Sequence, residues 1–279
     1  MVSILHALIF GIIEGITEFL PISSTGHLTI TEKLLGYHID DPAITAFTAI
    51  IQVGAVLATV FFFRTDITRI LKAWFAGLFK ASARATSDYK FGWAVILGSL
   101  PIGIVGFLFK DQIETTLRSL WFVAIALLLW SAVMWLADRL ATQTRHEKDT
   151  TWKDTVIIGI VQCLALIPGV SRSGATMSAG LFRGFDRVTV TKLSFFLSIP
   201  ALLAAGAYQA ATKFSDISNG VGWMPTLFAT VVSFIVAYAA VAWLLKFVAK
   251  HTYSVFIVYR LVLAAALIVL LATNTISAT

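Results

Sequence analysis

Charged residues are scarce in this chain of 279 residues, since only 13% are Asp, Glu, Lys or Arg while 58% are hydrophobic. Soluble globular proteins carry about a quarter charged residues, because their surface must stay in water. A soluble enzyme and a disordered chain are therefore both excluded. The apolar runs 120–137 and 259–272 are unbroken and lack the alternation of outer-membrane barrel strands. The sequence predicts an all-α polytopic membrane protein.

Other absences narrow the function. Cys163 is the single cysteine and lies in an apolar run, so no internal disulfide forms. The net charge of +6 comes without a basic stripe interleaved with aromatics, so no nucleic-acid partner is expected. Walker, GxSxG, HExxH and Cys/His metal motifs are absent, which removes nucleotide hydrolysis, ordinary esterase and zinc-protease chemistry. The first apolar stretch follows no Lys or Arg and contains Glu14 and Glu18, unlike a signal peptide.

Two kinds of apolar segment are present. Six are long enough to cross about 30 Å of hydrocarbon. Two more, 2–36 and 155–182, are broken in the middle by Pro21 and Pro168, each followed by serines and glycine that suit the start of a new helix. We expect these two regions to be re-entrant helical hairpins. The six predicted crossings are 43–63, 91–109, 120–140, 189–211, 223–248 and 255–272.

The loops between these segments alternate in basic content. Loops 64–90, 139–154 and 183–192 are rich in Lys and Arg, and Lys246 and Lys250 precede the last crossing. Loop 212–222, loop 110–118 with Lys110 and Arg118, and both termini are poorer. Because cytoplasmic loops carry the excess of Lys and Arg, the rich loops are predicted to be cytoplasmic and both termini periplasmic. This requires each hairpin to return to its own side, which allows the two tips to meet near the midplane.

An internal repeat supports this topology. Gly11 and Glu14, followed by Pro21, align with Gly159 and Gln162, followed by Pro168, at an offset of 148 and then 147 residues. Copies inserted with opposite orientation form an inverted-topology repeat, which places a binding site where broken helices meet. We expect a single integral-membrane domain over 1–279, with halves of roughly 1–140 and 155–279.

Glu14 and Glu18 are four residues apart, so their carboxylates share one helix face. A charged side chain at bilayer depth costs at least about 2.5–3.5 kcal/mol, so such groups face a wet cavity or a partner. Metal binding, general acid–base catalysis and a shared proton are all compatible with this pair. The alternative is a pair at a helix end near the interface.

Arg172 lies between Ser171 and Ser173 at a predicted helix start. Free backbone N–H groups, the helix dipole and a guanidinium fork together suit a phosphate-like anion. Thr176 adds a further hydroxyl. The small-residue run 174–180 taken alone would equally serve close helix packing, but the embedded arginine favours the anion site.

His27 follows Ser24 by three residues at the end of the first break. A lone histidine in an apolar chain is more often a structural hydrogen-bonding group. Beside serines, carboxylates and an anion site, an imidazole is also suited to deprotonate a nucleophile or protonate a leaving group near neutral pH. Phosphoryl chemistry at the membrane is the function that these residues favour most.

The segments 14–27 and 168–176 resemble the motifs of the undecaprenyl-pyrophosphate phosphatases, also called bacitracin-resistance proteins, and the similarity extends to 162–166 and to Tyr259-Arg260. The resemblance implies hydrolysis of C55 polyprenyl diphosphate to the monophosphate. This reaction recycles the lipid carrier of cell-wall polymers at the bacterial plasma (inner) membrane and gives resistance to bacitracin.

The resemblance also implies residue roles. Ser24 would be the nucleophile, His27 and Glu18 would assist proton transfer, and Arg172 would bind the diphosphate. Glu14 matches the acidic motif, where with Glu18 it would hold a divalent cation, Mg²⁺ or Ca²⁺. A homodimer with its site open to the outer face is expected, and the role of Arg260 stays open. The expected diphosphate pocket comprises Ser23, Thr25, Gly26, Ser171, Ser173, Gly174 and Thr176.

A second hypothesis comes from the repeat itself, because inverted repeats with broken helices are typical of transporters. The chain would then be a flippase for an anionic polyprenyl phosphate lipid. Transport alone would survive Ser24→Ala, whereas a phosphatase would lose its nucleophile.

Overall fold

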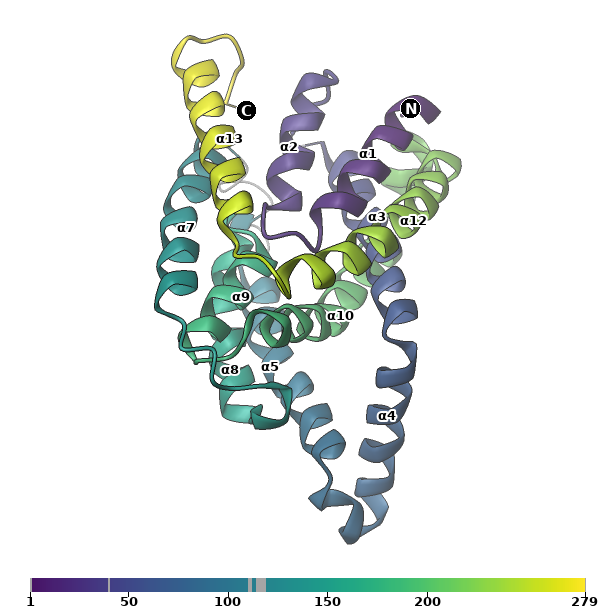
Figure 1. Cartoon of the computed structure of the whole chain (residues 1–279). Helices are drawn as coiled ribbons and strands as arrows, with labels where there is room; N and C mark the ends of the chain where they lie inside the picture. The colour runs from purple at the N-terminus through teal and green to yellow at the C-terminus, as the bar shows by residue number, and fades with distance from the viewer. Residues whose placement is uncertain (1, 40, 110–111, 114–118, 279) are drawn as a thin grey trace.

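A computed structural model describes residues 2–39, 41–109, 112–113 and 119–278 as a bundle of α-helices (Figure 1). Within these ranges no strand forms, and the one β-bridge joins Arg145 to Phe185. The predicted all-α class is confirmed. Lys110 and Arg118, which entered the charge alternation, lie outside the described residues.

Six helices are long and apolar enough to cross a membrane. They match the six predicted crossings to within a few residues, because lipid-facing helices need continuous apolar sequence to satisfy their backbone internally. The chain is thus a multi-pass membrane protein. The helices are α3 (Pro42–Phe62), α5 (Ser87–Leu108), α7 (Leu120–Leu140), α10 (Arg187–Thr212), α12 (Trp223–Val248) and α13 (Ser254–Ala272).

The two broken regions each form a pair of shorter helices. The first pair is α1 (Ile4–Thr17) and α2 (Ser24–Leu34), and the second is α8 (Trp152–Gln162) and α9 (Arg172–Phe182), with η4 (Cys163–Leu166) between. Both breaks fall at the expected prolines. Re-entry of these pairs in a bilayer and the inverted relation of the two halves stay predictions.

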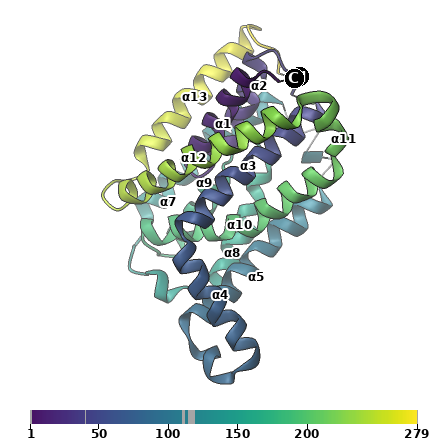
Figure 2. The ribbon, with the colours of Figure 1, turned by 90° about the vertical axis from the view of Figure 1, so that its right-hand side faces the viewer.

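The region 64–90 is not a plain loop, contrary to the sequence reading. It forms α4 (Arg64–Phe79) and the short η1 (Ala81–Ala85), and α4 packs against the start of α5. The many basic residues of this region suggested a loop, but they lie on the exposed side of a helix whose other side is apolar and includes Ile67, Ile70 and Trp74. Figures 1 and 2 show α4 extending beyond the rest of the bundle. The remaining short helices are η3 (Glu147–Asp149), α11 (Phe214–Asp216) and η5 (Ile217–Val221).

Glycines allow the broken helices to pack closely against long ones. A Cβ at Gly11 would lie 2.6 Å from the Ala229 carbonyl oxygen, which brings α1 against α12. A Cβ at Gly159 would lie 2.0 Å from the Gly98 carbonyl oxygen, which brings α8 against α5. Such close backbone approach is a common way for membrane helices to associate. It fixes the position of both helices that lead into the breaks.

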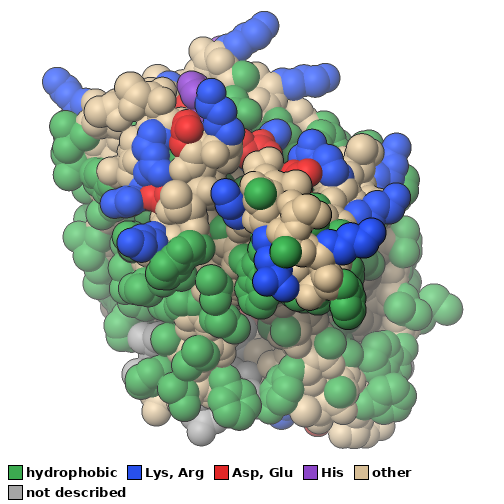
Figure 3. Space-filling model, turned by 90° about the horizontal axis from the view of Figure 1, so that it is seen from below, with side chains coloured by type: hydrophobic (Ala, Val, Ile, Leu, Met, Phe, Trp, Pro, Cys, Tyr) green, Lys and Arg blue, Asp and Glu red, His purple; other side chains and the backbone are tan. Residues whose placement is uncertain are grey.

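Charge is distributed unevenly between the two ends of the bundle. Lys and Arg side chains gather on the end that carries α4 (Figure 3), and both chain termini lie at the other end (Figure 1). This separation agrees with the alternation of basic loops in the sequence.

Candidate functional site

The two breaks, residues 18–23 before α2 and residues 167–171 before α9, meet inside the bundle, and we call them the two tips. The Gly169 N–H donates a hydrogen bond to Ser23 Oγ at 3.2 Å, and Ser173 Oγ donates to the Leu20 carbonyl at 2.8 Å. These contacts join residues that are about 150 positions apart in the chain. The expectation that the two tips converge is therefore confirmed.

The two tips share one local conformation. Ser23 has φ 75° and Ser171 has φ 76°, values that serine rarely adopts. Each is the N-cap of the following helix, and each side chain accepts a hydrogen bond from the N–H three residues later, that of Gly26 or Gly174. Backbone strain of this kind persists only where surrounding contacts hold it. The breaks thus turn the starts of α2 and α9 toward each other.

Arg260 on α13 holds both tips. Its side chain is fully buried and donates to the Pro21 carbonyl at 3.3 Å and to the Gly169 carbonyl at 2.9 Å. Its Nε donates to Ser131 Oγ on α7 at 3.2 Å. The residue whose role the sequence left open is a structural tie between the two breaks.

Ser24, Glu18 and Arg172 form a connected chain of polar contacts. Ser24 Oγ donates to Glu18 Oε2 at 2.5 Å, and Arg172 Nη2 donates to Glu18 Oε1 at 3.1 Å. Ser24 is the first residue of α2 and Arg172 the first of α9. A hydroxyl, a carboxylate within hydrogen-bond reach of it and a cation are thereby placed together, an arrangement that suits nucleophilic catalysis on a phosphate.

Arg172 keeps donors for a ligand. Its Nε and Nη1 are buried and form no hydrogen bond with any described residue. An unsatisfied buried donor costs about 1–3 kcal/mol or more when it is charged. An anion bound between the two helix starts would satisfy both nitrogens.

A cavity of about 230 Å³ opens at this point. Its polar lining residues come from the two tips and from α3, and most of its apolar ones come from α5, η4 and α10. A cavity of this kind suits a ligand with an anionic head and an apolar tail. Its lining comprises Glu18, Ser23, Ser24, Thr25, Thr45, Gln52, Ile102, Ile113, Ala165, Leu166, Pro168, Ser171, Arg172 and Leu202.

His27 lies away from this cavity. Its Nδ1 is 2.7 Å from the Ser23 carbonyl oxygen, and its Nε2 is 2.7 Å from the Tyr259 hydroxyl, whose ring stacks on the imidazole. Neither nitrogen contacts Ser24. The carboxylate of Glu18 is the group in contact with that serine, and proton transfer by His27 stays a prediction.

Four other expected pocket residues shape the tips without lining the cavity. Ser173 bonds the Leu20 carbonyl, and Thr176 Oγ1 donates to Ser194 Oγ at 2.7 Å. Gly26 and Gly174 supply the N–H groups that the serine caps accept. Of the expected pocket, Ser23, Thr25 and Ser171 line the cavity.

Glu14 is fully buried, and neither carboxylate oxygen bonds a described residue. Glu18 follows one turn later on the same helix face. Within the described ranges no group of three or more His, Cys, Asp and Glu is placed to hold a metal ion. Two carboxylates are still a sufficient protein contribution for Mg²⁺, which commonly keeps waters and binds substrate phosphates. The pair therefore has the chemistry to hold a divalent cation, and of the two carboxylates Glu18 lines the cavity.

Sequence reasoning missed the wall of the cavity formed by α3. Thr45 and Gln52 line it from one face of that helix, seven residues apart. The available signal was an amide inside an apolar crossing, which is costly unless it faces a cavity or a partner.

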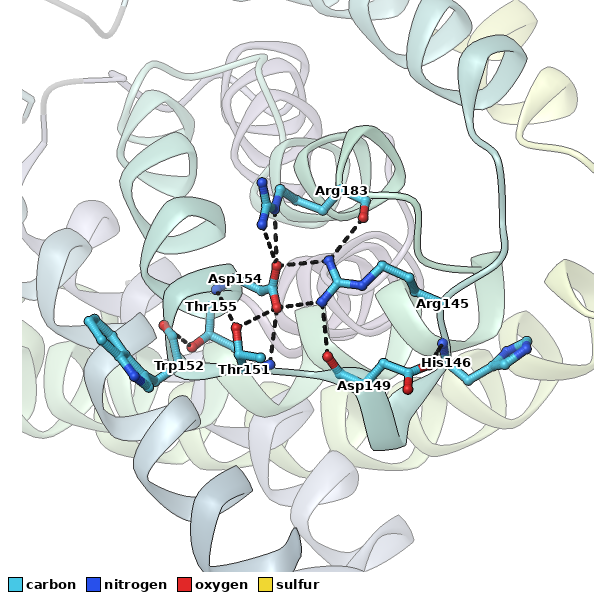
Figure 4. Close-up of polar contacts among 8 residues, drawn as sticks. All are labelled: Arg145, His146, Asp149, Thr151, Trp152, Asp154, Thr155 and Arg183. Carbon is cyan, nitrogen blue, oxygen red and sulfur yellow. Dashed lines mark hydrogen bonds and ion pairs between the residues drawn. The ribbon is translucent and has the colours of Figure 1, made fainter.

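A second polar cluster anchors α8 and α9 at their ends away from the cavity (Figure 4). Buried Asp154 accepts hydrogen bonds from Arg145 Nη2 at 2.7 Å, from Arg183 Nη2 at 2.8 Å and from Thr151 Oγ1 at 2.6 Å. Burial by itself raises the pKa of Asp154, but these hydrogen bonds prevail and lower it well below its usual range. The carboxylate stays charged and ties the start of α8 to the end of α9.

The comparisons with known proteins agree with this site. Residues 7–266 match the family model described as Bacitracin resistance protein BacA. Undecaprenyl-diphosphatase 3 of Frankia casuarinae is 68% identical over 277 residues, covering 99% of this chain and 100% of that protein. The undecaprenyl-diphosphatases of Cutibacterium acnes and Acidothermus cellulolyticus are 57% and 49% identical, over 98% of this chain and 99% and 98% of theirs. The chain belongs to the BacA family of bacitracin-resistance proteins.

Proposed function

We propose that this chain is an undecaprenyl-diphosphatase that hydrolyses C55 polyprenyl diphosphate to polyprenyl monophosphate and phosphate. The observation that carries the proposal is the Ser24–Glu18–Arg172 chain at a cavity lined by both polar and apolar residues. The names of the relatives support the same reaction. It would recycle the cell-wall lipid carrier and give resistance to bacitracin.

In the proposed mechanism Ser24 Oγ attacks the terminal phosphorus of the diphosphate while Glu18 takes the proton of the Ser24 hydroxyl. The bond from that phosphorus to the bridging oxygen breaks, and polyprenyl monophosphate leaves. The proton on Glu18 passes to the departing monophosphate, which restores the carboxylate. Water then attacks the phosphoserine and gives a proton to Glu18, which returns it to Ser24 Oγ as the bond between phosphorus and Oγ breaks, and inorganic phosphate is released. Arg172 and the N–H groups at the helix starts stabilise the charge on the transferred phosphoryl group.

Glu14 and Glu18 are the residues that would hold a divalent cation, Mg²⁺ or Ca²⁺. Such an ion supplies charge neutralisation at the phosphate oxygens. The two unpartnered oxygens of Glu14 support this assignment.

We place the protein in the bacterial plasma membrane, with the α4 end in the cytoplasm and both termini on the periplasmic side. The gathering of Lys and Arg at the α4 end supports this orientation. A homodimer with its site open to the outer face is proposed from family resemblance.

The test is phosphate release from farnesyl diphosphate by the purified protein in detergent, with and without EDTA. The wild type should release phosphate in a metal-dependent reaction. Ser24→Ala should lose at least about 10³-fold in kcat, because alanine has no hydroxyl to attack the phosphorus. Ser82→Ala, at an exposed position on η1, is the control and should equal the wild type.

Release by Ser24→Ala at the wild-type rate would move the attack to water or to another residue. No release by folded wild-type protein would overturn the proposed function. A flippase gains no support from the site, since transport gives no use to a serine hydroxyl bonded to a buried carboxylate.

A further inference from the structure

The α3 wall of the cavity carries a polar group that the proposed mechanism does not use. Gln52 lines the 230 Å³ cavity together with Ser24 and Arg172. It also lines a smaller adjoining cavity of about 120 Å³, next to Thr25 and Thr48. Gln52 therefore borders both cavities, near the start of α2.

The carboxamide of Gln52 makes no hydrogen bond with any residue in the described part of the chain. Other polar side chains of α3 behave differently: Thr48 Oγ1 donates to the Thr45 carbonyl at 3.1 Å, and Thr59 Oγ1 donates to the Ala55 carbonyl at 3.3 Å. The side chain is only partly buried and lines the cavity, so its donors and acceptor are available to a ligand bound there.

The layout of the cavity indicates which part of the ligand Gln52 meets. Ser24 and Arg172 come from the tips, so the phosphoryl group under attack lies against them. Apolar side chains such as Ile102 and Leu202 lie on the side that accepts a lipid tail. Gln52 lines the same cavity, so the second phosphate of a lipid diphosphate bound there comes within reach of the α3 wall.

We infer that the Gln52 carboxamide donates a hydrogen bond to the phosphate that remains attached to the lipid. The inference rests on the proposed function and names the recognition of its leaving group. When the bond to the bridging oxygen breaks, that oxygen keeps the electron pair and the lipid phosphate gains negative charge. A donor held at this point stabilises the departing charge. Because the amide is neutral, it also holds the product less tightly than a second arginine would.

Kinetics of Gln52 variants test the inference, with farnesyl diphosphate as substrate and two products as inhibitors. Gln52→Leu should lower kcat and raise the inhibition constant of farnesyl monophosphate, each by about 10- to 100-fold, as expected for one hydrogen bond to a charged group. Inhibition by inorganic phosphate, which occupies the tip side, should not change. Gln52→Glu should lower kcat further, because a carboxylate repels the phosphate.

Thr48→Val is the matched control, since it removes a hydroxyl from the smaller cavity alone and nearly keeps the side-chain shape. It should behave as the wild type. Inhibition by farnesyl monophosphate that is equal in Gln52→Leu and wild type would overturn the inference, as would equal weakening of both inhibitors. If the wild type itself releases no phosphate, the proposed function fails together with the inference; active wild type with an unaffected Gln52→Leu refutes the inference alone.

Discussion

Glu18 is the residue on which the site depends, because its two oxygens serve different partners. One accepts from Ser24 and the other from Arg172. A carboxylate in this position both takes a proton and fixes a guanidinium. A substitution at Glu18 therefore affects both contacts at once.

We predict that Glu18→Gln lowers kcat for farnesyl diphosphate by about 10²- to 10⁴-fold, the range for loss of a general base. The amide keeps the size of the side chain but does not accept the serine proton. Steady-state phosphate release measures the effect, with Glu147→Gln as the control at a distant carboxylate paired to Lys192. Wild-type activity in Glu18→Gln would assign the base to another group.

Arg260 leads to a prediction about stability. Arg260→Leu leaves the carbonyls of Pro21 and Gly169 without their donor, and each unsatisfied buried group costs about 1–3 kcal/mol. The midpoint of thermal unfolding in detergent should fall, and activity should fall with it because the tips separate. Lys250→Leu, at an exposed position, should leave both unchanged.

Some of these residue roles were predictable and others were not. Glu18 and Arg172 stood out because charged groups are costly in an apolar chain, whereas the expected role of Ser24 came from the family resemblance. The contact between His27 and Tyr259 was not predictable, because the two residues are 232 positions apart and only the packing of α13 brings them together. Gln52 was not among the expected site residues, because only the packing of α3 in the folded bundle brings it to the cavity.

At the scale of elements, the breaks of α1–α2 and α8–α9 were predictable and α4 was not. Proline followed by serine and glycine acts locally, so the sequence alone locates a break. The helical nature of α4 depends on burying Ile70 against α5, which is a property of the tertiary structure. Short amphipathic helices gain most of their stability from such packing.

The contact between α8 and α5 gives a prediction at this scale. Gly159→Ala should destabilise the protein by about 1–3 kcal/mol or more, because the new Cβ would lie 2.0 Å from the Gly98 carbonyl oxygen. Unfolding in a denaturing detergent titration measures the loss. Gly103→Ala on α5 is the matched control, since a Cβ there meets nothing within 4 Å and improves helix propensity. Equal stability of the two variants would mean that the glycine contact does not limit packing.

At the scale of the whole molecule, the Asp154 cluster couples the protein to pH. Its hydrogen bonds lower the pKa of the folded carboxyl below the unfolded value of about 3.9, so the stabilisation is complete above that value and declines as the pH falls below it. We predict that Asp154→Asn lowers the unfolding midpoint at pH 7 and that its difference from the wild type shrinks below about pH 4. A constant difference from pH 7 to pH 3 would contradict this account.

The orientation of the molecule is testable because the chain has one cysteine. In a Cys163→Ala background, Ser82→Cys on η1 should be protected from an impermeant thiol reagent in intact cells, and Thr275→Cys near the end of the chain should react. Permeabilised cells should label at both positions. The reverse pattern would invert the proposed topology.

The place of Arg260 in the chain also bears on biosynthesis. Both tips are translated before α13, but Arg260, which donates hydrogen bonds to both of them, belongs to this last helix. A nascent chain that has not yet been translated as far as residue 260 lacks the side chain that joins the two tips, so Ser24 and Glu18 are not yet held in place. Catalytic competence is therefore gained late, when insertion of the last crossing closes the assembly.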